Sequence, residues 1–167
     1  MESRAKLLGH PIHPMLIVFP LGLLGMAVIF DIIRLIWGKN ALGVASYYMI
    51  AAGVVTGLIA AVFGFVDWLA IPSGTRAKAV GTWHAIGNVV IVILFAVSWW
   101  LRRPNPSAST TAFVLGLIGL GLALVTGWLG GELVDRLGVG VDDGAHLDAP
   151  SSLSHEPASG RATTTRR

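Results

Sequence analysis

Histidines and carboxylates that could bind a metal stand at the ends of apolar segments. His10 and His13 lie in the stretch GHPIHPM, His84 lies in TWHAIGN, Asp67 lies in FVDWLA and Glu132 lies in WLGGELV. Imidazole nitrogens and carboxylate oxygens together suit Fe, Cu, Zn or Mn. We therefore take these five residues as candidate metal ligands, and the elements that carry them decide whether they can meet.

Asn88 extends this set, because it follows His84 by one helical turn. Residues at i and i+4 share a helix face, so the amide could orient the imidazole or bind the same ligand. In the first motif each histidine precedes a proline, which favours extended geometry. We expect His13 at the N-cap of a helix with Pro14 in its first turn, and we expect His10, His13, His84 and Asn88 to contact any cofactor.

The composition places the chain in a membrane. Of its 167 residues, 54% are hydrophobic and only 13% are charged, whereas about a quarter are charged in soluble domains. The mean hydropathy is +0.72. Four apolar runs each reach the roughly 20 residues that a spanning helix needs; they are Met15–Trp37, Val44–Ile71, Trp83–Leu101 and Ala112–Gly131.

The short polar connections between the runs predict an all-α integral membrane protein with a four-helix, up-down-up-down bundle. All six tryptophans fall near expected helix ends, as is typical of interfacial residues. The first run is long for a signal peptide and has no cleavage pattern after it, so we expect it to stay in the protein. The bundle would comprise residues 1–141.

This topology would bring the candidate residues to one membrane face, the face of both termini. For any one of them alone, a plain polar helix end is the favoured interpretation, and Asp67 could cap a helix or pair with Arg76 or Lys78. Their coincidence on one face favours a site. At the opposite end we expect a local ion pair between Asp31 and Arg34.

Residues 142–167 form a polar segment rich in Ser, Thr, Ala and Pro, which predicts a disordered, flexible tail. His146 and His155 would be solvated there. The net charge of +3 resides at helix flanks and in the tail, which disfavours nucleic-acid binding. The chain has no cysteine, which excludes disulfides, thiolate ligands and c-type haem attachment.

Three stretches carry a family resemblance: GHPIHPMLIVFPLGLL, FGFVDWLAIPSGTRAKAVGTWHAIGN and GWLGGELVDRLGVGV. Over about Gly9 to Val141 the chain resembles the bacterial membrane-protein family filed as domain of unknown function 2231. The resemblance implies four helices and a redox setting, because some relatives are fused to Rieske-type or c-type cytochrome modules. Relatives often have a histidine where this chain has Val18.

Several functions remain open. The first is a redox protein in which a b-type haem is bound by His84 with His13 or His10, or in which the same residues and the carboxylates bind a transition metal. The second is a proton relay or transporter, although the middle of the spans lacks ionisable groups. The third is a structural subunit of a larger complex.

The expected location is the bacterial cytoplasmic membrane, in contact with the lipid bilayer. Both termini would lie on one side, which we take as the cytoplasm from a small bias in basic residues. Rieske-type or cytochrome proteins would be the redox partners, and the chain could form a homo-oligomer.

Overall fold

The computed structural model describes residues 1–103, 105, 110–154 and 156. A two-residue hairpin, β1 (Lys6–Leu7) paired antiparallel with β2 (His10–Pro11), precedes the helices. The helices are α1 (Ile12–Leu16), α2 (Val18–Trp37), α3 (Asn40–Ala70), α4 (Arg76–Leu101) and α5 (Thr110–Gly131), and a π-helical turn, η1 (Glu132–Arg136), extends α5.

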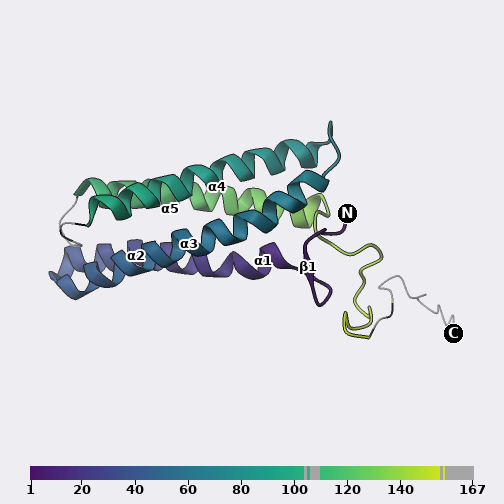
Figure 1. Ribbon diagram of the computed structural model, residues 1–167, viewed down its shortest axis with the longest axis horizontal. Helices are drawn as coiled ribbons and strands as arrows, with labels where there is room; N and C mark the ends of the chain where they lie inside the picture. Colours follow the sequence, from purple (N-terminus) through teal and green to yellow (C-terminus); the bar gives the residue numbers. More distant parts are fainter. Residues whose placement is uncertain (104, 106–109, 155, 157–167) are drawn as a thin grey trace.

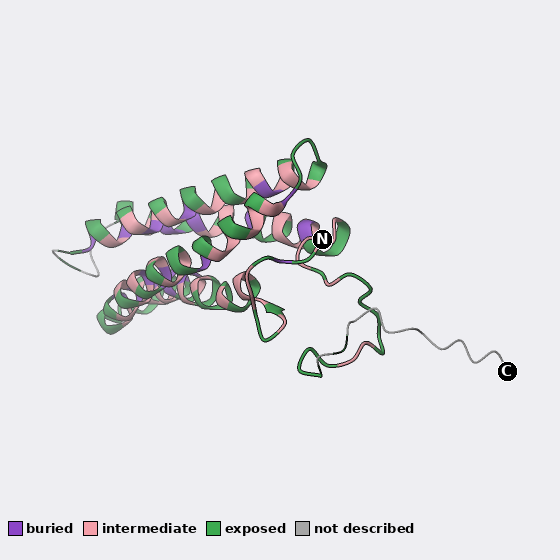
Figure 2. Cartoon of the chain, turned by 45° about the vertical axis from the view of Figure 1, so that its right-hand side comes forward, coloured by how far each residue is buried: buried purple, intermediate pink, exposed green. Residues whose placement is uncertain are grey.

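The four long helices form the expected up-down-up-down bundle (Figure 1). Each helix packs against the next, and α5 closes the bundle against α2, so that α2 and α4 lie diagonally opposite. All four spans are long and apolar enough to cross a membrane. Buried residues face inward and large apolar residues cover the outside (Figure 2). The protein is therefore a multi-pass membrane protein.

All four helical spans begin earlier than their apolar runs, and for α1 and α4 this corrects the placement of both central histidines. Thr75 is the N-cap of α4 and accepts a hydrogen bond from the Lys78 N–H at 3.1 Å. Consequently His84 lies about two turns inside α4 rather than at its start. His13 lies inside α1, whose N-cap is Pro11. Polar first turns hid these boundaries, because hydropathy marks the apolar part of a helix and not its ends.

Pro20 accounts for an interruption in the first span. The span is interrupted at Ile17, which separates α1 from α2. A proline has no N–H to donate to the carbonyl four residues earlier, and its ring crowds that carbonyl. The Ile17 N–H still donates to the His13 carbonyl at 3.1 Å, so the two pieces continue in nearly one direction.

The two hairpins, α1–α2–α3 and α4–α5, repeat the same internal design. The offset of 71 residues that separates Asp31 from Arg102 also separates His13 from His84 and Leu24 from Phe95. Leu24 and Phe95 are buried, and each fills the space beside a glycine of the neighbouring helix, Gly53 and Gly119 respectively.

The second helices of the hairpins match in the same way. Ser46, Ile50, Gly53 and Ala60 are buried on α3, and at identical spacings Ala112, Gly116, Gly119 and Thr126 are buried on α5. Because corresponding helices run in the same direction, the halves are related by an approximate two-fold axis along the bundle. In membrane proteins built from parallel repeats, the residues of binding sites commonly lie at the interface between the repeats.

Asp31 and Arg102 meet across this axis, so the expected Asp31–Arg34 pair is wrong. The Arg102 guanidinium donates to both Asp31 oxygens at 2.9 and 2.6 Å and to Ser46 Oγ at 3.2 Å. Only 4% of the Arg102 side chain and 1% of the Asp31 side chain are exposed. A bidentate pair that excludes lipid outcompetes a weak local pair on one helix.

The N-terminal residues pack against the residues that follow η1 at the other end of the bundle. The Met1 ammonium donates to the Gly138 carbonyl at 2.9 Å, and Lys6 contacts both Glu2 and Asp142. The described part of the polar tail, up to residue 154, has no helix or strand and runs back along this segment. His155 and most of the expected disordered tail lie outside the described residues.

The axial ion pair yields a stability prediction. Changing Asp31→Asn leaves the Arg102 charge buried and unpaired, which should lower the free energy of unfolding by about 3–5 kcal/mol. The exchanged variant Asp31→Arg/Arg102→Asp should recover more than half of that loss, because the two positions are equivalent. Unfolding in mixed detergent micelles measures both. An exchanged variant no more stable than Asp31→Asn would contradict the equivalence.

The contact of Lys6 with Glu2 and Asp142 yields a pH prediction. The hydrogen bond from Lys6 lowers the pKa of Glu2, and the hydrogen bonds to Asp142 and Glu2 raise the pKa of Lys6. The Glu2 contribution is thus present above roughly pH 4 and lost as acid protonates it, and the Lys6 contribution is present below roughly pH 10 and lost in stronger base. The protection factors of the amides of residues 2–6, which correct each exchange rate for the intrinsic pH dependence of exchange, should be highest between these limits, and Lys6→Ala should abolish this dependence.

Candidate functional site

His13 is held by the neighbouring helix of its own hairpin. Its Nδ1 lies 2.9 Å from the carbonyl oxygen of Ala60 on α3. A carbonyl oxygen can only accept, so Nδ1 carries the proton and Nε2 of the neutral ring keeps its lone pair. The side chain is half-buried, and its position is set by one hydrogen bond to the main chain.

His84 repeats this arrangement in the second hairpin. Its Nδ1 lies 2.8 Å from the carbonyl oxygen of Thr126 on α5, the residue equivalent to Ala60. Asn88, one turn further along α4, donates to the His84 carbonyl at 2.8 Å and lies with Nδ2 3.1 Å from His84 Nε2. The expected contact of amide with imidazole is therefore present.

The two imidazoles face each other near the two-fold axis. Their ring centroids are 6.4 Å apart, and the ring planes are nearly perpendicular at 85°. Both rings donate through Nδ1, which leaves two Nε2 atoms as the basic nitrogens of the pair. Metal-bound histidines commonly show this second-shell pattern, in which the other ring nitrogen donates to a carbonyl.

Glycines make room for the two rings. A Cβ at Gly64 would lie 2.8 Å from His13 Nδ1, and one at Gly130 would lie 3.2 Å from His84 Cε1. Each glycine follows its hydrogen-bonding carbonyl by four residues, so both belong to the repeated design. The imidazoles themselves occupy the space that Gly64 and Gly130 leave open.

Asp67 lies at the same end of the bundle but binds the N-terminal segment. Both of its oxygens accept from Ser3 Oγ at 2.8 Å, and Oδ1 also accepts from the N–H groups of Arg4 and Ala5 at 2.8 and 3.3 Å. This accounts for a carboxylate near a membrane surface without Arg76 or Lys78 as a partner. Asp67 anchors residues 3–5 over the end of α3.

The other two candidate ligands also have their own contacts. Glu132 forms an ion pair with Arg76 at 2.6 Å and thereby ties the start of α4 to the end of α5. His10 lies in the hairpin ahead of α1, with Nε2 3.3 Å from Ser152 Oγ. Among the residues that the structure describes, no group of three or more His, Asp or Glu side chains is arranged to bind a metal ion.

The structure therefore brings His13, His84 and Asn88 together out of the predicted residues. The carbonyl groups of Ala60 and Thr126 were absent from the sequence-based set, because any residue type can supply a carbonyl. A signal was nevertheless present in the sequence. Gly53, Ala60 and Gly64 of α3 recur at the same spacing as Gly119, Thr126 and Gly130 of α5.

Comparison with known families supports the membrane assignment. The sequence model of the family described as "Predicted membrane protein (DUF2231)" matches residues 9–143. The chain belongs to the DUF2231 family. The match includes the axial ion pair and the histidine pair, so both features of this DUF2231 protein lie inside the family region. No curated protein and no solved structure matches the chain.

The glycine contacts yield a third prediction. Gly64→Ala should push the His13 ring off the Ala60 carbonyl and lower the thermal stability. Gly127→Ala is the matched control, because a Cβ there would meet nothing within 4 Å and alanine gains roughly 0.5–1 kcal/mol over glycine in a helix. Thermal unfolding in detergent should therefore shift in opposite directions for the two variants. Equal shifts would show that His13 is not held as described.

Proposed function

We propose that His13 and His84 bind one redox-active metal centre near the axis of the bundle, and that the protein transfers electrons at the membrane. The observation that carries the proposal is the repeated anchoring of both rings. Each Nδ1 donates to a main-chain carbonyl at 2.8–2.9 Å, so neither ring turns freely and Nε2 is the nitrogen left to act as a ligand. At His84 the Asn88 amide, whose Nδ2 lies 3.1 Å from Nε2, would have to turn aside for a metal to bind.

The number of ligands favours a b-type haem. A metal ion bound by protein alone usually takes three or four side chains, and the described residues offer two imidazoles without a third His, Asp or Glu. A haem would need only two side-chain ligands, because its porphyrin supplies four nitrogens. His13 and His84 would hold it, and the haem would supply a one-electron couple.

A bound transition-metal ion is the second form of the proposal. Asn88 supports it, because its amide lies 3.1 Å from His84 Nε2 and could offer its oxygen after rotation about its last torsion. Asp67 and Glu132 would then contribute to the shape of this end of the bundle and not to the ligand set, since both carboxylates already accept from donors of this chain.

A proton relay is the alternative that a specific observation favours. The Asp31–Arg102 pair lies on the same axis as the two histidines, so ionisable groups stand at two levels of the bundle. The buried side chains Leu24, Val28 and Phe95 belong to the apolar core of the bundle. A relay through the axis would require water between them, which makes electron transfer at one end the simpler function.

The proposed setting follows from the position of the histidines. They lie at the end of the bundle where the hairpin β1–β2 and the tail lie, so a redox partner would dock on that surface. A Rieske-type or cytochrome protein in a bacterial cytoplasmic membrane would be suitable, as would a second copy of the chain.

The deciding experiment is absorption spectroscopy with metal analysis on the purified protein. The protein is produced with added haem precursor and metals, and spectra are recorded oxidised and dithionite-reduced. We expect Soret and α bands, or one metal ion per chain without them. Either signal should disappear in His84→Ala and in His13→Ala, and it should remain in the control His10→Ala, because His10 lies outside the pair.

The outcomes separate the alternatives. Bands that depend on both histidines would establish a haem, and a metal without bands would establish the second form. Absence of both signals would overturn the redox proposal and leave the relay or a structural subunit. A signal retained in both histidine variants would place the centre elsewhere.

A further inference from the structure

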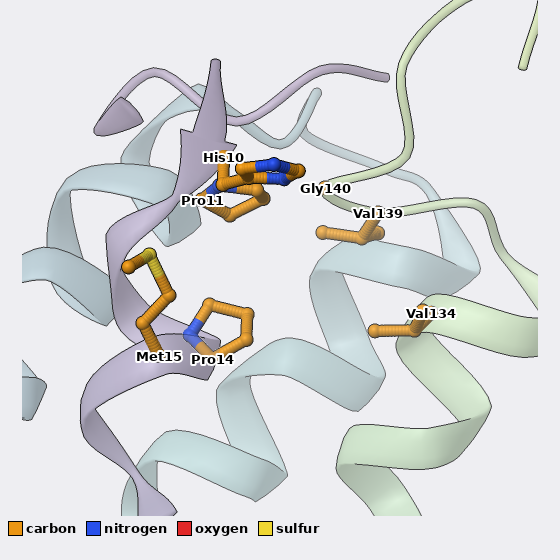
Figure 3. Close-up of a pocket in the computed structure, with 7 residues that line it drawn as sticks. All are labelled: His10, Pro11, Pro14, Met15, Val134, Val139 and Gly140. Carbon is orange, nitrogen blue, oxygen red and sulfur yellow. The ribbon is translucent and has the colours of Figure 1, made fainter. Parts of the chain in front are cut away.

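A cleft of about 370 Å³ lies between α1 and η1, beside the histidine pair (Figure 3). Pro14 and Met15 line it from α1, Val134 lines it from η1, and His10, Pro11 and Val139 complete the walls. Pro14 and Val134 project toward each other from opposite sides (Figure 3). The volume lies within the range of roughly 300–1,000 Å³ that is usual for small-molecule sites.

The equivalent place across the two-fold axis, between α3 and α4, is filled by an indole. Trp68 stands on α3 where Val134 stands after α5, at the spacing that relates Ala60 to Thr126. The Trp68 Nε1 donates to Thr82 Oγ1 at 3.1 Å, and its ring lies 3.3 Å from the position of a Cβ at Gly81. An aromatic ring thus lies wedged between α3 and α4 at the level of the cleft.

A second difference, in where α1 and α4 begin, makes the cleft wider than the equivalent place between α3 and α4. Helix α4 begins about two turns before His84, whereas α1 begins only one residue before His13. The hairpin β1–β2 occupies the place of those turns and brings His10 to the wall. The cleft between α1 and η1 therefore lacks both a ring and a length of helix that the equivalent place between α4 and α3 has, and the hydrogen-bonding imidazole of His10 stands at its edge.

The lining specifies the chemistry of an occupant. It contains no Asp, Glu, Lys or Arg, so it offers nothing to neutralise a charged ligand. A sugar would need several hydrogen-bonding partners, and His10 is the one lining side chain that can provide them. A flat apolar ring with one or two carbonyl groups fits the walls, and the exposed apolar outside of the helices places the cleft where such a molecule reaches it from lipid.

We propose that this cleft binds the head group of a membrane-soluble quinone. The quinone ring takes the position that the Trp68 indole has across the two-fold axis, and a quinone carbonyl is hydrogen-bonded to His10. The proposal concerns binding alone. It holds whether or not His13 and His84 bind a metal centre, although a quinone here would stand next to that centre.

The test fills the cleft with an indole, as Trp68 fills the equivalent place between α3 and α4. Saturable binding of 2-methyl-1,4-naphthoquinone, whose fused rings are close to an indole in size, is measured by calorimetry on the metal-free and haem-free chain in nanodiscs, with empty nanodiscs as the blank. We expect one molecule per chain, at least tenfold weaker binding in Val134→Trp, and roughly tenfold weaker binding in His10→Ala. Val125→Trp is the matched control, because Val125 is exposed on the outside of α5.

The outcomes decide the proposal directly. No saturable binding to the natural sequence, or equal binding by Val134→Trp and Val125→Trp, would overturn it. Met15→Trp fills the cleft from the opposite wall and replaces Val134→Trp if that variant does not fold. Binding that persists in His84→Ala would separate this site from the metal centre, whose presence is read from spectra and metal content alone.

Discussion

A charged side chain buried between the helices of this protein is costly unless it finds a partner inside the bundle, because neither lipid nor the apolar core can supply one. The chain meets this constraint across its two-fold axis. Asp31 and Arg102 neutralise each other at one end, and the two histidines face each other at the opposite end. The order in which the helices pack and the close approach at the glycines bring the two members of each pair together.

The repeated design explains why diagonal helices can meet at all. Side chains such as Leu24 and Phe95 lie against glycines of the adjacent helix, which lets the helices of each hairpin approach closely. The hairpins then share a narrow centre, and residues of α1, α2 and α4 reach one another there. Two departures from the repeat lie at the end with the N-terminus, where Val134 replaces an indole and a hairpin replaces two helical turns.

Much of the fold was predictable, because the physics that selects it is local. Four long apolar runs with short polar connections allow few arrangements, and Pro20 marks the interruption of the first span. Helix starts were less accessible: the polar first turns of α3 and α4 carry no hydropathy signal, so His84 was expected at a helix end. The pairing of Asp31 with Arg102 depends on helices distant in sequence, which a reading of one helix cannot reveal.

The candidate site was predictable in part for the same reason. The i and i+4 spacing of His84 and Asn88 is a local feature, and the contact is present. Grouping Asp67 and Glu132 with the histidines relied on a shared membrane face, and a face is much larger than a coordination sphere. In the structure Ser3 and Arg76 bind these two carboxylates first.

The hydrogen bonds of the histidine pair also impose an order on biosynthesis. His13 leaves the ribosome before α3, α4 and α5, yet its ring is fixed by α3 and faces a residue of α4 whose own anchor, Thr126, lies on α5. The pair and both of its anchors are complete only after α5 has been inserted. Loading of any prosthetic group at this place would therefore be a step that follows translation, and a truncated chain would be unable to retain it.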